Sequence, residues 1–253
     1  MSDIFLSALI SVHNEEDQLA ECLERLKFAD EIVVLLDKCT DTSGEIAKSY
    51  TDRVFEGSWE KEGHRRNAGI EHCRGTWVFE VDADERVPDN LAEEILTTVK
   101  TTRYDWHEIL VDNYIGGQLV RWGWGASFGK AAYPGLFRKG VKEWGLQRVH
   151  PSLKWSGEKG PMLQNRLEHY VDRDISDMIR RLDNYSSAKA RDLRENGETW
   201  GSTANNVRRL FSRFLKCYVM RKGYREGGYG FLIALFAGLY PLLSHLKAKL
   251  EDS

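Results

Sequence analysis

The sequence predicts an α/β fold built on a doubly wound, mostly parallel sheet. Short apolar runs alternate with segments whose apolar residues recur at helical spacing, and this alternation continues through the first hundred residues. Strands that alternate with helices are joined by crossover connections, which make neighbouring strands parallel. With 253 residues, 42% of them hydrophobic and 30% charged, the chain is long enough for one large domain with an appendage.

Four buried strands are expected in the first half, each followed by a polar loop and a helix. They are expected over residues 5–12, 32–36, 53–55 and 77–81. Helical spacing between the first two strands is carried by Leu19, Cys22, Leu23 and Leu26. After the fourth strand, Pro88 suits the first turn of a helix that is expected to run to about Lys100.

Polar side chains follow three of these strands directly. Asn14 and Glu15 follow the first, Asp37 the second, and Asp82 and Asp84 the fourth. In an open parallel sheet, ligands bind beyond the carboxyl ends of the strands. Asp82 and Asp84 are two residues apart, so an extended backbone would direct both carboxylates the same way. Oxygen ligands at this spacing suit Mg²⁺ or Mn²⁺, with a substrate diphosphate completing the shell; a solvated acidic turn is the alternative.

These motifs, in this order, resemble a known family. The series is His13-Asn14-Glu15-Glu16, Asp37-x-x-x-Asp41-x-Ser43, Arg66-Asn67-x-Gly69 and Asp82-x-Asp84. It is similar to the nucleotide-sugar half of family 2 glycosyltransferases, and most of all to bacterial lipopolysaccharide-core enzymes of the β-1,4-glucosyltransferase type. The resemblance implies the GT-A fold, a Rossmann-like sheet. It also implies inverting, metal-dependent transfer of a hexose from a nucleoside diphosphate sugar, preferably a UDP-sugar, to a lipid-linked saccharide.

The resemblance gives each donor-side residue an expected role. Asn14, Glu15 and Asp37 would hold the base or the ribose, and Arg66 would reach the base or the diphosphate because a guanidinium fork suits phosphate oxygens. Asp82 would contact the ribose or a metal-bound water. The ordinary alternatives are a helix-starting glutamate, a capping aspartate and a solvated arginine.

The expected metal ligands are Asp84 and His169. Asp84 would bind Mg²⁺ or Mn²⁺ directly. The histidine of Leu167-Glu168-His169-Tyr170 resembles one that completes the metal site in GT-A enzymes, and imidazole is an acceptable ligand for Mn²⁺. A purely structural histidine is the alternative.

The catalytic base is expected near residue 150. The resembling enzymes often have Val-His-Glu there, but this chain has Val149-His150-Pro151, and proline cannot accept a proton. His150 is the substitute, because its ordinary pKa suits a base. Glu158 and Glu143 are rivals, and a structural role for His150 is the alternative.

Upstream of that position, Arg121-Trp122-Gly123-Trp124 is expected to form a floor for a sugar ring or a phosphorylated sugar, or else to cover the sheet edge. The predicted glycosyltransferase domain spans residues 1–172, with the nucleotide-sugar half over 1–103 and the acceptor half over 104–172.

Residues 173–253 predict a helical extension that associates with a membrane. A helix is expected over residues 175–194, followed by seven Arg or Lys and no Asp or Glu between Thr199 and Arg225. Apolar residues interleave with these cations, which predicts a basic amphipathic helix on an anionic membrane surface rather than on nucleic acid. The apolar run Phe231–Leu243 is expected to break at Gly238 and Pro241 and to be too short to span a membrane.

Cysteine spacing and the N-terminal sequence favour a cytoplasmic protein, peripheral on the inner face of the cell membrane, because neither paired cysteines nor a leader pattern is present. Three rival functions remain. A polyprenyl-phosphate sugar synthase would need no base and so fits Pro151. A catalytically silent, membrane-docked nucleotide-sugar-binding protein is the second. A nucleotidyltransferase is disfavoured, because a glycine-rich phosphate loop does not follow the first strand.

Overall fold

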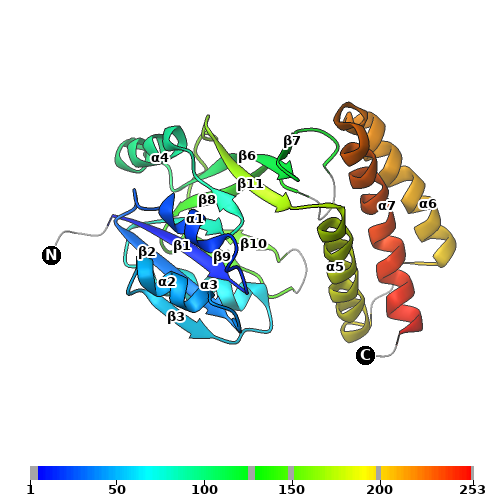
Figure 1. Cartoon of the computed structure of the whole chain (residues 1–253), viewed down its shortest axis with the longest axis horizontal. Helices are drawn as coiled ribbons and strands as arrows, with labels where there is room; N and C mark the ends of the chain where they lie inside the picture. Colours follow the sequence, from blue (N-terminus) through cyan, green and yellow to red (C-terminus); the bar gives the residue numbers. More distant parts are fainter. Residues whose placement is uncertain (1–4, 125–128, 148–150, 198–200, 252–253) are drawn as a thin grey trace. The chain divides into compact units, whose positions relative to one another are not determined.

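The computed structural model describes residues 5–124, 129–147, 151–197 and 201–251 (Figure 1). The chain forms two compact units. The sheet unit comprises residues 1–111 and 132–169, and the helical unit comprises residues 112–131 and 170–253. The helical unit therefore includes an internal segment of the predicted acceptor half as well as the predicted C-terminal extension.

The main sheet has nine strands within the described residues, in the order β3-β2-β1-β4-β8-β6-β11-β5, with β7 paired to β6. The first four are parallel: β1 (Leu6–Val12), β2 (Glu31–Asp37), β3 (Val54–Gly57) and β4 (Trp77–Asp82). Beyond β4 the sheet continues through β8 (Ala132–Arg138), β6 (Trp106–Ile115), β11 (Arg166–Asp172) and β5 (Glu85–Arg86), with β7 (Gln118–Val120) beside β6. β8 is antiparallel to both β4 and β6, β7 is antiparallel to β6, and β5 is antiparallel to β11. The predicted doubly wound α/β class is confirmed, with antiparallel pairs in the second half of the sheet that the sequence does not reveal.

Helices cover both faces of the parallel half. Alternate residues of β1 point to opposite faces, as strand geometry requires. Leu6, Ala8 and Ile10 share a core with α1 (Leu19–Glu24), α2 (Ser43–Tyr50) and α4 (Asp89–Thr101). Leu9 packs instead with Ile70 of α3 (Glu62–His72). The sheet is therefore a middle layer, and its carboxyl-terminal edge is left to the loops.

A small antiparallel pair, β9 (Lys142–Trp144) and β10 (Leu153–Trp155), packs beside α3. The side chain of Asn67 donates to the Trp144 carbonyl and accepts from the Trp144 amide, each at 2.9 Å. A Cβ on Gly63 would lie 1.9 Å from the Gly145 carbonyl oxygen, so only glycine allows this approach. The start of α3 is thereby fixed against β9.

The helical unit is built around α7 (Gly227–Leu250), which packs against both α5 (Ile175–Glu195) and α6 (Thr203–Leu215) (Figure 1). A π-helical turn (Lys216–Met220) and a 3₁₀ turn (Gly223–Glu226) connect α6 to α7. The core of the unit includes Ile115, Val120 and Trp124 from the internal segment, together with Met178, Leu182, Ile233, Ala234, Ala237 and Tyr240 from the helices.

The expected break in the last apolar run is wrong. α7 continues through Gly238 and Pro241 for 24 residues. A Cβ on Gly238 would lie 2.6 Å from the Leu210 carbonyl oxygen, so this glycine permits close packing on α6 rather than ending the helix. By length and composition alone, the helical stretch Gly223–Leu250 is the one in the described chain that could cross a membrane. Half of its most apolar window is buried inside the protein.

Candidate active site

The carboxyl ends of β1, β2 and β4 lie next to one another at a single edge of the sheet unit. Val12 of β1 pairs with Leu36 of β2, and Ser11 of β1 pairs with Asp82 of β4. The strands run parallel, so the residues that follow them emerge on the same side. The expected shared edge is therefore confirmed for Asn14, Glu15, Asp37 and Asp82.

The loops after β1 and β2 bind each other through side-chain to backbone hydrogen bonds. Asn14 has a φ of 54°, a conformation that asparagine tolerates better than most residues, and its Oδ1 accepts from the Thr40 amide at 2.7 Å. The Glu15 amide donates to Ser43 Oγ at 2.9 Å. These bonds give Asn14 and Glu15 a structural part in shaping the loop, whatever they bind.

Asp37 is held by the segment that leads into α3. Its Oδ1 accepts from the Trp59 amide at 3.1 Å, and its Oδ2 lies 3.3 Å from Arg65 Nη1. The carboxylate is largely buried, with 13% of the side chain exposed. The sequence singled out Arg66 but not its neighbour Arg65. The two side chains leave the helix in different directions, and the sequence does not show which of them faces Asp37.

Arg66 connects α3 to the end of β4. Its Nη2 donates to Asp82 Oδ1 at 2.7 Å, its Nε donates to Glu62 at 3.0 Å, and its guanidinium carbon lies 5.0 Å from the centre of the Trp144 ring. Burial by itself would lower the pKa of Arg66, but the charges of Asp82 and Glu62 outweigh it and hold that pKa above its usual value. The structure thus brings the predicted Arg66 and Asp82 into direct contact.

Asp84 and His169 also meet. His169 Nε2 lies 3.2 Å from Asp84 Oδ2, and antiparallel pairing of His169 with Glu85 places β11 beside this turn. The other carboxylate oxygen, Asp84 Oδ1, is buried without a hydrogen-bond partner. Such an oxygen fits a cation, because a buried acceptor with no partner is costly. No cluster of three or more His, Cys, Asp or Glu that could hold a metal ion occurs within the described residues.

A buried charged network lies beneath Arg66, and sequence reasoning missed it. Glu80 of β4 and Lys142 of β9 form an ion pair in which neither side chain is more than 2% exposed. Trp144 Nε1 donates to Glu80 Oε1 at 3.0 Å. Burial lowers the pKa of Lys142, against the opposing charge of Glu80. The available signal was one acid inside an otherwise apolar strand, Trp77-Val78-Phe79-Glu80-Val81, because a lone buried charge requires a partner.

Glu158, a predicted rival base, is not near this edge. Its amide donates to Asp105 Oδ2 at 2.8 Å, and its carbonyl accepts from the Asp105 amide at 2.9 Å. Asp105 in turn lies beside Arg138, which pairs with Trp77 at the start of β4, whereas Asp82 ends that strand. The assignment of Glu158 as the base is therefore corrected, because it lies at the opposite edge of the sheet.

The two other candidates for the catalytic base are Glu143 and His150. Glu143 is exposed on β9 and forms an ion pair with Lys154 at 3.1 Å. His150 lies outside the described residues, so its proposed role stays a prediction.

Known proteins resemble this chain in sequence. A model of the family Glycosyl transferase family 2 matches residues 7–140. The lipopolysaccharide core biosynthesis glycosyltransferase LpsC of Rhizobium meliloti (strain 1021) is 26% identical over 96% of this chain and 91% of its own length. An uncharacterized glycosyltransferase of Rickettsia prowazekii (strain Madrid E) is 25% identical over 98% of this chain and 87% of its own length.

Among solved structures, S. aureus TarS 1–349 in complex with UDP aligns with a TM-score of 0.49 and 12% identity, covering 88% of this chain and 75% of that chain. The family match covers more than half of the sequence and contains the residues from Asn14 to Asp84. The protein therefore belongs to glycosyl transferase family 2 and is a glycosyltransferase.

Proposed function

We propose that this glycosyltransferase moves a hexose from a UDP-sugar to a lipid-linked saccharide of the cell envelope, with inversion at the anomeric carbon. The observation that carries the proposal is the convergence of Asp37, Arg66, Asp82 and Asp84 at one strand edge of a family 2 chain. The printed name of the relative LpsC, a lipopolysaccharide core biosynthesis enzyme, supports an acceptor of that class.

The donor would be held by residues of the sheet unit. Asp37 would accept hydrogen bonds from the base or the ribose, because two nearby donors already fix its carboxylate in place. Asn14 and Glu15 would close over the same group from the adjacent loop. Arg66 would shift part of its hydrogen bonding from Asp82 to the diphosphate, which would leave Asp82 available to the ribose or to a water.

Asp84 and His169 would hold a divalent cation, Mg²⁺ or Mn²⁺. The support is Asp84 Oδ1, buried without a partner, beside an imidazole 3.2 Å from the other oxygen of the same carboxylate. When bound, such a cation neutralises the charge that develops on a departing diphosphate. Protein ligands would be few, which suits a site that shares its cation with substrate oxygens.

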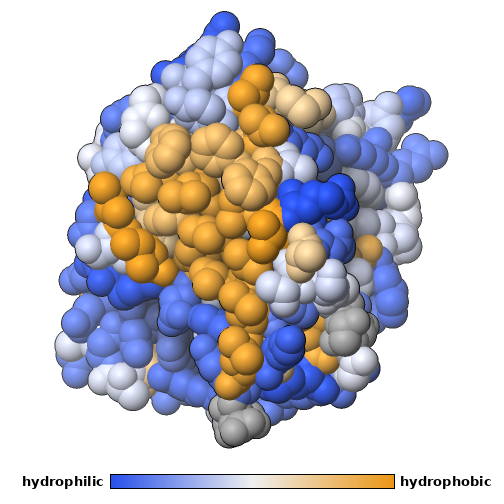
Figure 2. All heavy atoms as spheres, turned by 90° about the vertical axis from the view of Figure 1, so that its right-hand side faces the viewer, coloured by the Kyte–Doolittle hydropathy of each residue, from blue (hydrophilic) through white to orange (hydrophobic). Residues whose placement is uncertain are grey.

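The helical unit would place the enzyme on the cytoplasmic face of the membrane. Figure 2 shows a continuous hydrophobic region on the side of α6 and α7. We call it the apolar face, and its large exposed side chains are Val207, Phe211, Leu215, Val219, Met220, Tyr224 and Phe231. Seven cations lie in the same stretch of sequence. The apolar side chains would enter the membrane interface, and the cations would attract anionic head groups. Each Lys or Arg near the membrane surface contributes about 1 kcal/mol to binding.

Calorimetric titration with UDP and with GDP, each with and without Mn²⁺, tests the donor site. Metal-dependent binding of UDP is expected. Loss of a residue that only supports a metal ligand costs about 10–100-fold in affinity, so Asp84→Ala should weaken the metal-dependent binding at least that much. Asp89→Ala removes an exposed carboxylate in the first turn of α4 and serves as the control. Unchanged UDP binding in Asp84→Ala would overturn the metal assignment, and no nucleotide binding by the wild type would overturn the donor assignment.

A further inference from the structure

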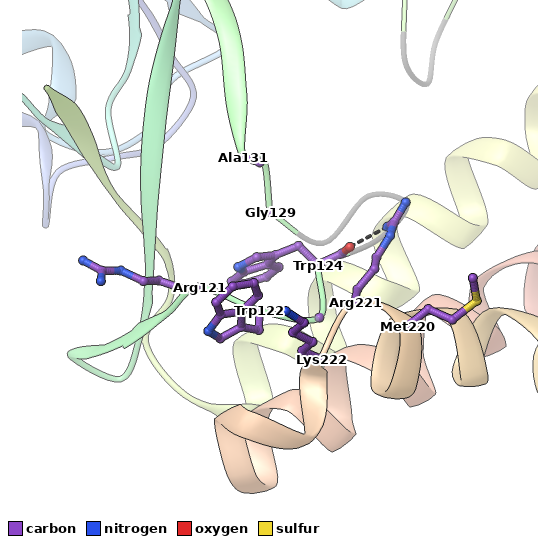
Figure 3. Close-up of a pocket in the computed structure, with 9 residues that line it drawn as sticks. Arg121, Trp122, Trp124, Gly129, Ala131, Met220, Arg221 and Lys222 are labelled. Carbon is purple, nitrogen blue, oxygen red and sulfur yellow. Dashed lines mark hydrogen bonds between the residues drawn. The ribbon is translucent and has the colours of Figure 1, made fainter. Parts of the chain in front are cut away.

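A pocket of about 540 Å³ lies wholly within the helical unit (Figure 3). It opens between the segment after β7 and the turn that joins the π-helical turn to the 3₁₀ turn. Its principal side chains are Arg121, Trp122, Trp124, Met220, Arg221 and Lys222. Three of the six are cations, and no carboxylate occurs among the described residues that line the pocket.

Backbone contacts hold the two walls of the pocket together. The Gly123 amide donates to the Arg221 carbonyl at 2.9 Å. Glu226 Oε1 accepts from the amides of Arg121 and Trp122, also at 2.9 Å each. A Cβ on Gly123 would lie 2.8 Å from the Cα of Gly223, so the two segments that form the walls touch at a pair of glycines. The walls are therefore built by specific bonds.

Two of the three cations of the pocket, Arg221 and Lys222, are held in position without being neutralised. Arg221 Nη1 donates to the Trp124 carbonyl at 2.5 Å, and Lys222 Nζ lies 5.1 Å from the centre of the Trp122 ring (Figure 3). A carbonyl and an aromatic ring orient a cation but leave its net charge in place. In the described part of the chain, neither Arg221 nor Lys222 forms an ion pair with a carboxylate. Arg121 differs, because it lies 3.5 Å from Asp112.

The backbone of Lys222 is strained. Its φ of 60° and ψ of 28° fall in the left-handed region, which lysine rarely occupies. Strain of this kind costs free energy and gathers at binding sites. The strained conformation brings Lys222 to the same pocket as Arg221, although side chains of consecutive residues usually diverge.

Met220 belongs both to the pocket and to the apolar face. It is 75% exposed and adjoins Val219, which is 53% exposed. A molecule that filled the pocket could therefore extend an apolar portion along α6 without leaving the protein surface. The combination of two uncompensated cations with an adjoining apolar strip matches an amphiphile with a phosphate group.

We propose that this pocket binds the phosphate group of the lipid-anchored acceptor, whose hydrocarbon portion lies along the apolar face. The proposal rests on the proposed function, since it specifies the acceptor as a phosphorylated lipid. Lysine and arginine would donate charge-assisted hydrogen bonds to the phosphate oxygens, and each such bond to a charged group is worth about ten-fold in affinity.

Vesicle binding by the full chain tests this proposal. Phosphatidylcholine vesicles would carry either phosphatidic acid, which exposes a phosphomonoester, or phosphatidylserine, with the two sets matched in zeta potential. We expect wild-type protein to bind the phosphatidic acid vesicles about ten-fold more tightly. The pocket pair Arg221→Gln with Lys222→Asn should lose this preference, and asparagine tolerates the left-handed backbone at position 222.

The control pair Arg208→Gln with Lys216→Gln removes the same charge from exposed positions outside the pocket. It should bind both kinds of vesicle more weakly yet keep the preference. Equal loss of preference in both pairs, or no preference in the wild type, would overturn the pocket assignment. Circular dichroism of each variant confirms folding.

Two further measurements separate the possible causes of a negative result. Calorimetry with inorganic phosphate alone should show weak binding or none, because the hydrocarbon contributes to affinity. Tight binding of inorganic phosphate without a vesicle preference would reassign the pocket to a soluble ligand and overturn the lipid proposal. UDP titration of the same wild-type sample reports on the sheet unit. UDP binding without a vesicle preference would refute only the pocket, whereas a vesicle preference without UDP binding would refute the proposed function.

Discussion

Arg65 and Arg66 are consecutive residues that bind acids on two different strands. Successive side chains leave an α-helix about 100° apart, so one arginine reaches Asp37 at the end of β2 and the other reaches Asp82 at the end of β4. Glu62, one turn earlier on α3, also pairs with Arg66, so Arg66 lies between two carboxylates while Arg65 forms a separate pair with Asp37. A diphosphate entering this edge would meet two cations whose positions are already fixed.

Removing either partner of the buried pair Glu80–Lys142 should strongly destabilise the fold. Lys142→Met keeps most of the apolar stem but leaves Glu80 charged and buried, and breaking a buried pair costs about 3–5 kcal/mol. Urea denaturation measures the change in the free energy of unfolding. Lys154→Met is the matched control on the neighbouring strand, because its pair with Glu143 is exposed and worth about 1 kcal/mol or less.

Removing both charges should restore part of that loss. Glu80→Gln combined with Lys142→Met buries no ion, so the double variant should be more stable than Lys142→Met alone. If Lys142→Met and Lys154→Met destabilise the protein equally, the pair does not behave as a buried charge.

The position of a polar residue in the fold could be predicted from sequence where that residue follows a strand, but not where two distant residues must meet. Asp37, Asp82 and Asp84 could be found because each comes directly after an apolar run. Glu80 and Lys142 could not be paired from sequence, since 62 positions separate them and the register of β9 beside α3 is set by tertiary packing. Glu158 was misplaced because its loop contacts the beginning of β6, a strand whose direction the sequence does not disclose.

At the scale of elements, Asp177 in the first turn of α5 should make the stability of the protein depend on pH in the acid range. Burial by itself would raise the pKa of Asp177, but hydrogen bonds from Arg173 and Arg180 outweigh it and lower the pKa to about 2 from an ordinary 3.8. A lowered folded-state pKa stabilises the protein above the ordinary value, and this contribution disappears as pH falls from 3.8 through about 2.

Asp177→Asn should therefore destabilise the protein at neutral pH and make progressively less difference towards pH 2. Urea denaturation at a series of pH values measures this. Both arginine side chains are more than 60% exposed, so added salt should reduce the effect. Asp89→Asn, an exposed acid in the first turn of α4, should show a smaller dependence. An effect of Asp177→Asn that stays constant over this range would contradict the assignment.

The apolar face of α6 should govern membrane binding without governing the fold. Phe211 and Leu215 are 64% and 55% exposed, so replacing both with serine removes little from the core. Each large apolar side chain transferred from water contributes about 1.5–3 kcal/mol, which predicts at least a ten-fold loss of binding to anionic vesicles. Ile179→Ser on α5, at 53% exposure, is the matched control and should bind normally. Equal vesicle binding by all three proteins would exclude this face.

Predicted elements were most accurate where local pattern and packing agree. The observed β1, β2, β4 and α5 differ from expectation by no more than one residue at either end. α7 was underestimated because Gly238 and Pro241 usually end helices. Here the glycine fits against the Leu210 carbonyl, and packing against α5 and α6 outweighs the hydrogen bond that proline cannot donate.

At the scale of the whole molecule, the chain passes between its two units more than once. It leaves the sheet unit after Val111, returns at Ala132, and leaves again after His169. Ile115, Val120 and Trp124 lie in the internal segment but belong to the core of the helical unit. No single cut in the sequence therefore separates the two cores.

This interleaving limits how such enzymes can exchange parts during evolution. A recombination event near residue 170 would deliver the C-terminal helices of one parent together with the internal segment of the other, and the hybrid core would combine side chains that had never been selected together. Lineages can therefore acquire a new helical unit only by inheriting two distant stretches of gene at once, or by gradual change within one line of descent. Chimeras designed between relatives of this protein need two crossover points flanking residues 112–131 in addition to one near residue 170.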